Sequence, residues 1–202
     1  MGSTPDISKG EGFIRTYDLF EHLLDDVYKS LEMMLSDKES QYLRRVFVRN
    51  VFACIEGIVQ ILKYEISKDI RLGRYCVELT NKEKEVLYEE KYRNGDRTKI
   101  FIPIDKNVKK TFFVAGKVWG LSCFSLNTDG EKYRAFLKAK ETRNRLAHPR
   151  TYYDIDITDT EIDAVGKAFE WVRSSFLSLM KEKVKSVSSE LPDNVLNGLK
   201  NA

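Results

Sequence analysis

Apolar residues recur at intervals of three and four along most of the chain, and this spacing predicts amphipathic α-helices. The first predicted helix covers residues 12–34, and the second covers residues 40–70 and is apolar around most of its circumference. At about 100° per residue, the polar positions of the second helix fall in one narrow stripe, which we expect to face solvent or a cleft. The stripe consists of Tyr42, Arg45, Arg49, Glu56, Gln60 and Lys63.

The pattern changes after the second helix. Asn81 is expected to cap a short helix over residues 82–87. Two runs rich in β-forming residues, 88–93 and 96–102, then flank an Asn-Gly pair at 94–95. Asn-Gly between such runs is typical of a tight hairpin turn, so the sequence predicts a β-hairpin inserted between helices.

Two further helices are predicted after the hairpin. They cover residues 106–122 and 131–148, with a loop at 127–130 between them. Pro149 disfavours helical geometry for the residue before it, so the second of these helices is expected to end at His148.

The last predicted helix begins after a short run, residues 152–157, that we expect to be extended. Its start is marked by Thr158 and Glu161, which have the spacing of a capping box. After Lys185 the sequence turns polar, which is typical of a loose terminal tail.

These elements predict an all-α fold, an antiparallel helical bundle of about five helices with a small inserted β-hairpin. No internal repeat or domain boundary is visible, so residues 1–202 are expected to form a single domain. Its ordered core should cover about residues 11–185, with the hairpin insert at about 88–102 and the tail at 186–202.

Composition supports a globular protein and adds little about its function. Hydrophobic residues make up 42% and aromatic residues 11% of the 202 positions, which excludes disorder as the dominant state. The net charge is only +3, so any affinity for nucleic acid must come from a local patch. No signal peptide, membrane helix or Cys-x-x-Cys pair is visible, so a cytoplasmic protein with reduced thiols and no membrane association is expected.

The segment that suggests chemistry is KAKETRNRLAHPR, residues 138–150. On a helical wheel Arg143 lies in the middle of the apolar face, where a charge needs a carboxylate, a wet cleft or an anionic ligand. Asn144 follows it, and His148 ends the same helix one turn later. An Arg, an amide and a titratable His at a helix end suit phosphodiester cleavage, because Arg can hold the phosphate and His can move a proton. This chemistry requires no metal, and no cofactor is expected.

Cationic residues crowd into the same segment. Five Lys and Arg residues stand against one Glu between positions 138 and 150, a local charge of +4. Such a patch is enough to contact a phosphate backbone, although charge runs are often simply solvated. The residues predicted to bind RNA are Lys138, Lys140, Arg145 and Arg150.

The run RNRLAH at 143–148 resembles the Arg-x4–6-His motif of the HEPN superfamily, including the polar residue directly after the Arg. HEPN domains are helical bundles, and many are metal-independent ribonucleases of toxin–antitoxin or phage-defence systems whose active site forms at a dimer interface. The resemblance implies a homodimeric endoribonuclease that leaves 2′,3′-cyclic phosphate or 3′-phosphate ends, with an antitoxin or regulatory protein as a possible partner. His148 would be the general acid/base, Arg143 would hold the scissile phosphate, and Asn144 would orient one of them.

Other interpretations of this segment stay open. Arg143 could form a buried ion pair with an acid such as Glu56 or Asp163 that fixes the register of the helices. Tyr152 and Tyr153 could stack on bases, or pack in a core or an interface. The chain could therefore be a non-catalytic HEPN module that binds RNA or a protein partner, or a purely structural dimerisation bundle.

Overall fold

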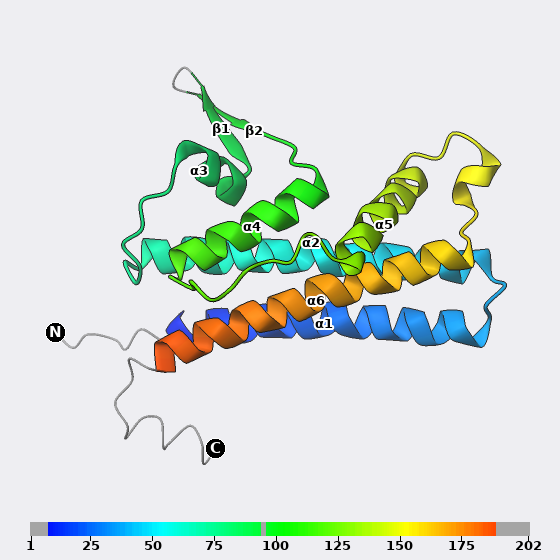
Figure 1. Cartoon of the computed structure of the whole chain (residues 1–202), viewed down its shortest axis with the longest axis horizontal. Coiled ribbons are helices and arrows are strands. Elements are labelled where there is room, and N and C mark those ends of the chain that lie inside the picture. The colour runs from blue at the N-terminus through cyan, green and yellow to red at the C-terminus, as the bar shows by residue number, and fades with distance from the viewer. Residues whose placement is uncertain (1–7, 94–95, 189–202) are drawn as a thin grey trace, which may run out of the picture. The chain divides into compact units, whose positions relative to one another are not determined.

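The computed structural model describes residues 8–93 and 96–188 (Figure 1). These residues form six α-helices, a two-stranded antiparallel sheet and one short 3-10 helix, so the predicted helical fold with a small hairpin is confirmed. In chain order the elements are α1 (Ser8–Ser36), α2 (Gln41–Arg71), α3 (Asn81–Tyr88), β1 (Glu90–Arg93), β2 (Asp96–Lys99), α4 (Ile104–Val118), α5 (Glu131–Ala147), the 3-10 helix η1 (Tyr152–Ile155) and α6 (Asp159–Ser188).

The contacts along the chain group into two compact units. Of the described residues, 8–61 and 131–169 form unit 1, whereas 62–93, 96–130 and 170–188 form unit 2. The long helices α2 and α6 each contribute their N-terminal part to unit 1 and their C-terminal part to unit 2. None of the described helices combines the length and the apolar character needed to cross a membrane.

Unit 1 is built on the N-terminal part of α2, whose apolar positions are almost completely buried, as its sequence predicts. Gly57 lets α1 approach α2 closely, because a Cβ atom at this position would clash with the side chain of Leu23. On another side of α2, the rings of Phe52 and Phe136 stack with centroids 6.5 Å apart and join α2 to α5. The helix that carries the candidate motif is therefore fixed to the core of this unit.

In unit 2 the short helix α3 begins at Asn81, one residue before the start expected from the sequence. Thr80, and not Asn81, is the N-cap residue. Its backbone N–H donates to Oε2 of Glu83 at 2.7 Å, and the Glu83 N–H donates to Thr80 Oγ1 at 3.3 Å. The two bonds form a capping box, which explains the choice of Thr80.

The predicted β-hairpin is present, with shorter strands than the sequence suggests. Strands β1 and β2 pair from Glu90↔Lys99 to Arg93↔Asp96, and the turn at 94–95 lies outside the described residues. The first strand starts late because Tyr88 ends α3 and Glu89 adopts a left-handed conformation with φ 53°.

Helix α4 begins two residues before the expected start and ends four residues before the expected end. Its N-cap is Pro103, a residue that suits a helix start because it has no N–H to satisfy. It ends at Val118 because Gly120 takes a φ of 65°, a left-handed conformation that commonly terminates helices.

A cluster around Asp69 organises the packing in unit 2. Trp119 Nε1 and Lys183 Nζ donate to Asp69 Oδ2 at 3.0 and 2.8 Å, and Arg74 Nη1 donates to Oδ1 at 2.9 Å. The Lys183 ammonium also lies 3.9 Å from the centre of the Trp119 ring. These contacts join α2, α4 and α6.

The end of α5 follows the expectation drawn from Pro149, because Ala147 is its last helical residue and His148 lies just beyond it. The extended run expected at 152–157 is wrong, since residues 152–155 form the 3-10 helix η1. Asp154 explains the difference: its Oδ2 accepts hydrogen bonds from the backbone N–H of Arg150 at 2.8 Å and of Thr151 at 2.7 Å, and this curls the chain.

The capping box at the start of α6 is confirmed. The Thr158 N–H donates to Glu161 Oε2 at 2.9 Å, and the Glu161 N–H donates to Thr158 Oγ1 at 3.3 Å. Helix α6 continues to Ser188, so the beginning of the expected tail is helical, and the rest of the tail lies outside the described residues.

Candidate functional site

Arg143 projects from α5 toward α2 and is only partly buried, with 32% of its side chain exposed. Its Nη2 contacts Oε1 of Glu56 at 2.6 Å, and its Nη1 donates to Oδ1 of Asn144 at 3.4 Å. The helical wheel predicts that Arg143 needs a partner, and Glu56, one of the two acids suggested, is that partner. The other acid, Asp163, instead pairs with Lys167 at 3.0 Å. The pair holds the guanidinium in one orientation without covering it.

A surface hollow of about 230 Å³ lies beside this pair, between α5 and the unit 1 part of α2. Its floor is apolar, and its charged residues are Arg143, Glu56 and Arg49. Arg49 is exposed and forms no ion pair within the described residues. The residues that line the hollow are Val48, Arg49, Phe52, Ala53, Glu56, Arg143, Leu146 and Ala147.

Sequence reasoning names Glu56 as one candidate partner of Arg143 and misses Arg49, although one signal in the sequence points to both residues. Both residues belong to the polar stripe of the second helix, which the sequence predicts to face solvent or a cleft. Their distance from the motif along the chain hides the connection, because only the packing of α2 against α5 brings the stripe to Arg143.

His148 stands at the exposed end of α5. Its backbone N–H donates to the carbonyl of Asn144 at 3.2 Å, which closes the last turn. Its imidazole forms no hydrogen bond or ion pair within the described residues and does not line the hollow around Arg143. The structure therefore brings Arg143 and Asn144 into contact and leaves His148 accessible one turn further along.

Arg145 is engaged within unit 1. Its Nη1 donates to the backbone carbonyls of Tyr153, Asp154 and Asp156 at 3.2, 2.7 and 2.9 Å. Its Nη2 forms an ion pair with Oε1 of Glu161 at 2.5 Å. The guanidinium ties η1 and the start of α6 to α5, so it has little remaining capacity for a phosphate group.

Glu161 completes this network. Oε1 also accepts a hydrogen bond from Thr142 Oγ1 at 3.1 Å. Burial favours the neutral carboxyl, but the hydrogen bonds from the Thr158 N–H and from Arg145 outweigh it, so the pKa of Glu161 lies below its usual value. The carboxylate is therefore ionised at neutral pH and stabilises the turn that follows the motif.

The other predicted RNA-binding cations differ in their surroundings. Lys140 lies 3.4 Å from the carboxylate of Glu141. Lys138 and Arg150 are exposed and form no ion pair within the part of the chain that the structure describes. Lys138 lines a second hollow, of about 490 Å³ between α5 and the unit 1 part of α6, which Asn144 also lines. Of the four cations, Lys138 and Arg150 thus have charges available to an external anion.

Metal ligands do not gather near these residues. Within residues 8–93 and 96–188, no three His, Cys, Asp or Glu side chains are grouped as a metal site would require. Asp154, which belongs to an Asp-x-Asp sequence, directs its carboxylate to backbone N–H groups of its own turn. The same hydrogen bonds, from Arg150 and Thr151, hold the pKa of Asp154 below its usual value.

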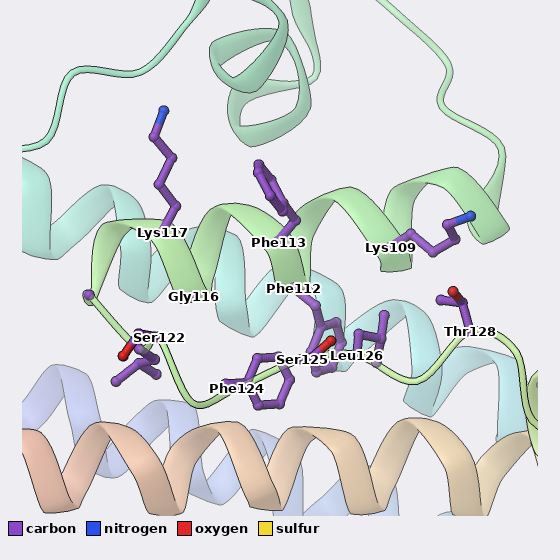
Figure 2. Close-up of a pocket in the computed structure, with 12 residues that line it drawn as sticks. Lys109, Phe112, Phe113, Gly116, Lys117, Ser122, Phe124, Ser125, Leu126 and Thr128 are labelled. Carbon is purple, nitrogen blue, oxygen red and sulfur yellow. The ribbon is translucent and has the colours of Figure 1, made fainter.

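Unit 2 contains a different kind of cavity (Figure 2). It has a volume of about 690 Å³, and its walls come from α4 and the loop that follows it. Its aromatic lining includes Phe112, Phe113 and Phe124, and the rings of Phe112 and Phe124 stack with centroids 6.2 Å apart. None of the candidate site residues named in the sequence analysis lines this cavity, whose lining is mostly apolar and also includes Lys109 and Lys117.

Comparison with known proteins does not identify the chain. No model of a protein family matches it, and no curated protein or solved structure matches it. Function must therefore be inferred from the residues and from their geometry.

Proposed function

We propose that this protein is a metal-independent endoribonuclease of HEPN type whose site is built from Arg143, Asn144 and His148. The observation that carries the proposal is the state of Arg143: Glu56 orients its guanidinium, which stays partly exposed at the edge of a hollow. An arginine that served only to hold elements together would gain from an acceptor for most of its donors, as Arg145 illustrates nearby with three carbonyls and the Glu161 carboxylate.

Arg143 would bind the scissile phosphate. A guanidinium carries five N–H donors, and the contacts to Glu56 and Asn144 engage both of its terminal nitrogens without using all of them. The unused N–H groups can donate to a phosphate oxygen and stabilise the charge that develops on it in the transition state. Arg49, across the same hollow, would supply a second positive charge.

His148 would transfer the proton. Its exposed imidazole can remove a proton from a ribose 2′-hydroxyl, whose oxygen then attacks phosphorus. The new O2′–P bond forms as the P–O5′ bond breaks, and the leaving 5′-oxygen takes up a proton. The products are a 2′,3′-cyclic phosphate and a 5′-hydroxyl. We include a homodimer as the active species, in which a second copy of the chain would bring a second His148 for the second proton transfer.

The same proposal covers the setting of the enzyme. Three free cysteines, two of them exposed, suit a reducing compartment such as the cytoplasm. An uncontrolled ribonuclease would damage the cell that makes it, so we include an antitoxin or another regulatory protein as a partner.

The test is RNA cleavage in the presence of EDTA. We expect His148→Ala to lose about 10²- to 10⁴-fold in rate, the usual contribution of a general acid or base. The chain offers a matched control, because His22→Ala removes the other histidine from an exposed position on α1 and should leave cleavage unchanged. Products with 3′-hydroxyl ends, or activity abolished by EDTA, would exclude this mechanism.

A non-catalytic module that binds RNA or a protein is the second candidate. The structural use of Arg145, together with the pairing of Arg143 with Glu56, favours it. It predicts that neither wild type nor His148→Ala cleaves RNA and that both bind it equally, whereas Lys138→Ala combined with Arg150→Ala weakens binding.

A further inference from the structure

Two adjacent tyrosines on η1 are highly exposed to solvent. The side chains of Tyr152 and Tyr153 are 74% and 79% exposed, so neither contributes to the core. Their rings meet edge to face, with centroids 6.2 Å apart and an angle of 78° between the planes. The pair therefore presents ring faces to the exterior.

The backbone that carries these rings is held from two directions. The Arg145 guanidinium donates to three backbone carbonyls of the segment 153–156. The Asp154 carboxylate accepts hydrogen bonds from the backbone N–H groups of Arg150 and Thr151. A loop held in this way loses little conformational entropy when a ligand binds. The two rings thus form a preorganised surface.

The surroundings of the rings favour a nucleic acid over a protein. Arg150 precedes the pair, is exposed and has no ion-pair partner within the described residues, and Thr151 beside it is also exposed. Arg150 also belongs to the run 138–150, whose local charge of +4 suits a polyanion. Aromatic faces next to a cation are the combination with which proteins bind unpaired bases and their phosphates.

We propose that Tyr152 and Tyr153 form a stacking platform for unpaired bases of single-stranded RNA and that Arg150 binds an adjacent phosphate. The inference rests on the proposed function for the identity of the ligand, and it adds how the substrate is selected. His148 precedes Tyr152 by four residues, so bases held on the platform would place the strand beside the proposed acid/base. Duplex RNA hides its base faces and would bind less well.

The experiment measures fluorescence anisotropy with two labelled probes, a short oligoadenylate and a strand of equal length built from abasic ribose phosphates. All variants carry His148→Ala so that the RNA stays intact, and the buffer contains EDTA. We expect Tyr152→Ala combined with Tyr153→Ala to raise the Kd for oligoadenylate about tenfold or more, since one stacked base is worth about fivefold to a hundredfold in affinity. The Kd for the abasic strand should not change.

Matched variants isolate the role of the rings. Tyr152→Phe combined with Tyr153→Phe keeps both aromatic faces and should bind oligoadenylate like the parent. Arg150→Ala should weaken binding of both probes alike, because both carry phosphates. Tyr64→Ala removes an exposed tyrosine of unit 2, 51% exposed, and should change neither Kd.

The outcomes separate this inference from the proposed function. If the alanine pair leaves the Kd for oligoadenylate unchanged, or if the parent does not bind oligoadenylate, the platform is wrong, whether or not the wild-type protein cleaves RNA. If base-dependent binding is lost in the alanine pair and wild type cleaves nothing, the platform stands and the ribonuclease proposal fails. If light scattering shows that the alanine pair changes only the oligomeric state, the rings contact another protein chain and the platform is wrong.

Discussion

The Asp69 cluster of unit 2 and the Arg143 site of unit 1 both place a charged side chain against polar partners. They differ in how much hydrogen-bonding capacity the charged group keeps for an external ligand. Asp69 is 1% exposed, and its two oxygens accept three hydrogen bonds from Trp119, Lys183 and Arg74. Arg143 remains partly exposed and has one short contact to Glu56 and one long contact to Asn144.

The difference teaches how to separate structural from functional charges in this fold. A buried carboxylate that already accepts three hydrogen bonds has little capacity left for a ligand, and removing it leaves its partners without an acceptor. A charge held on one side only, next to a hollow, keeps donors for an incoming anion. Burial by itself would have ranked Asp69 first, whereas the count of unused donors points to Arg143.

The largest effect that this comparison predicts is a loss of stability in unit 2. Asp69→Ala leaves the Lys183 ammonium and the Trp119 indole N–H without their acceptor in a buried place. Breaking a buried pair in this way costs about 3–5 kcal/mol of unfolding free energy. Urea denaturation followed by circular dichroism measures it, with Asp129→Ala, an exposed acid of the same unit, as the control. A change below about 1 kcal/mol would remove the contrast between the two clusters.

For Arg143 we predict the opposite: a large effect on RNA cleavage and a small effect on stability. Arg143→Ala should slow RNA cleavage by about 10²- to 10³-fold, the usual cost of losing a group that stabilises transition-state charge. Its effect on the unfolding free energy should stay below about 1 kcal/mol, because the ion pair with Glu56 is open to solvent. Arg134→Ala, which removes an exposed arginine of the same helix, should alter neither quantity. Destabilisation as large as that of Asp69→Ala would make Arg143 a structural residue.

The smallest predicted effect concerns pH and the network behind the motif. The pKa of Glu161 is lower in the folded state than its usual value of 4.5. The ionised carboxylate therefore stabilises the folded protein fully at pH values above 4.5. That contribution is lost as the pH falls from 4.5 through the folded-state pKa. Glu161→Gln should therefore flatten the dependence of the unfolding free energy on pH in this window, by less than about 1 kcal/mol. Thermal melts at a series of acidic pH values measure it, and parallel curves for the two proteins would contradict the prediction.

Elements whose signals lie close together in the sequence are predictable in this chain. Pro149 sets the end of α5, and Thr158 with Glu161 sets the start of α6, since both devices act within a single turn. The run at 152–157 shows the limit of such reasoning. Its alternating pattern suggests a strand, but the described part of unit 1 contains no strand that could pair with it, and the local hydrogen bonds of Asp154 favour a 3-10 turn.

The candidate site was predictable in its residues and less so in their roles. Helical periodicity shows that Arg143 needs a partner and that Glu56 lies in a stripe able to offer one, yet it cannot select Glu56 over Asp163 without the packing of α2 against α5. Arg145 lies on the polar face of the wheel and was expected to bind RNA. Its bonds to three carbonyls depend on how the chain returns after Pro149, which no periodicity describes.

The way in which Arg145 holds η1 has a consequence for how the protein can change. The loop is shaped by bonds to backbone atoms and by the side chain of Asp154, and the exposed rings of Tyr152 and Tyr153 take no part in that shaping. Selection, natural or in the laboratory, can therefore exchange the residues at these two positions without disturbing the loop that displays them. In the proposed platform, two neighbouring codons would set the ligand preference of the protein independently of its scaffold, which makes them the natural choice for a combinatorial library.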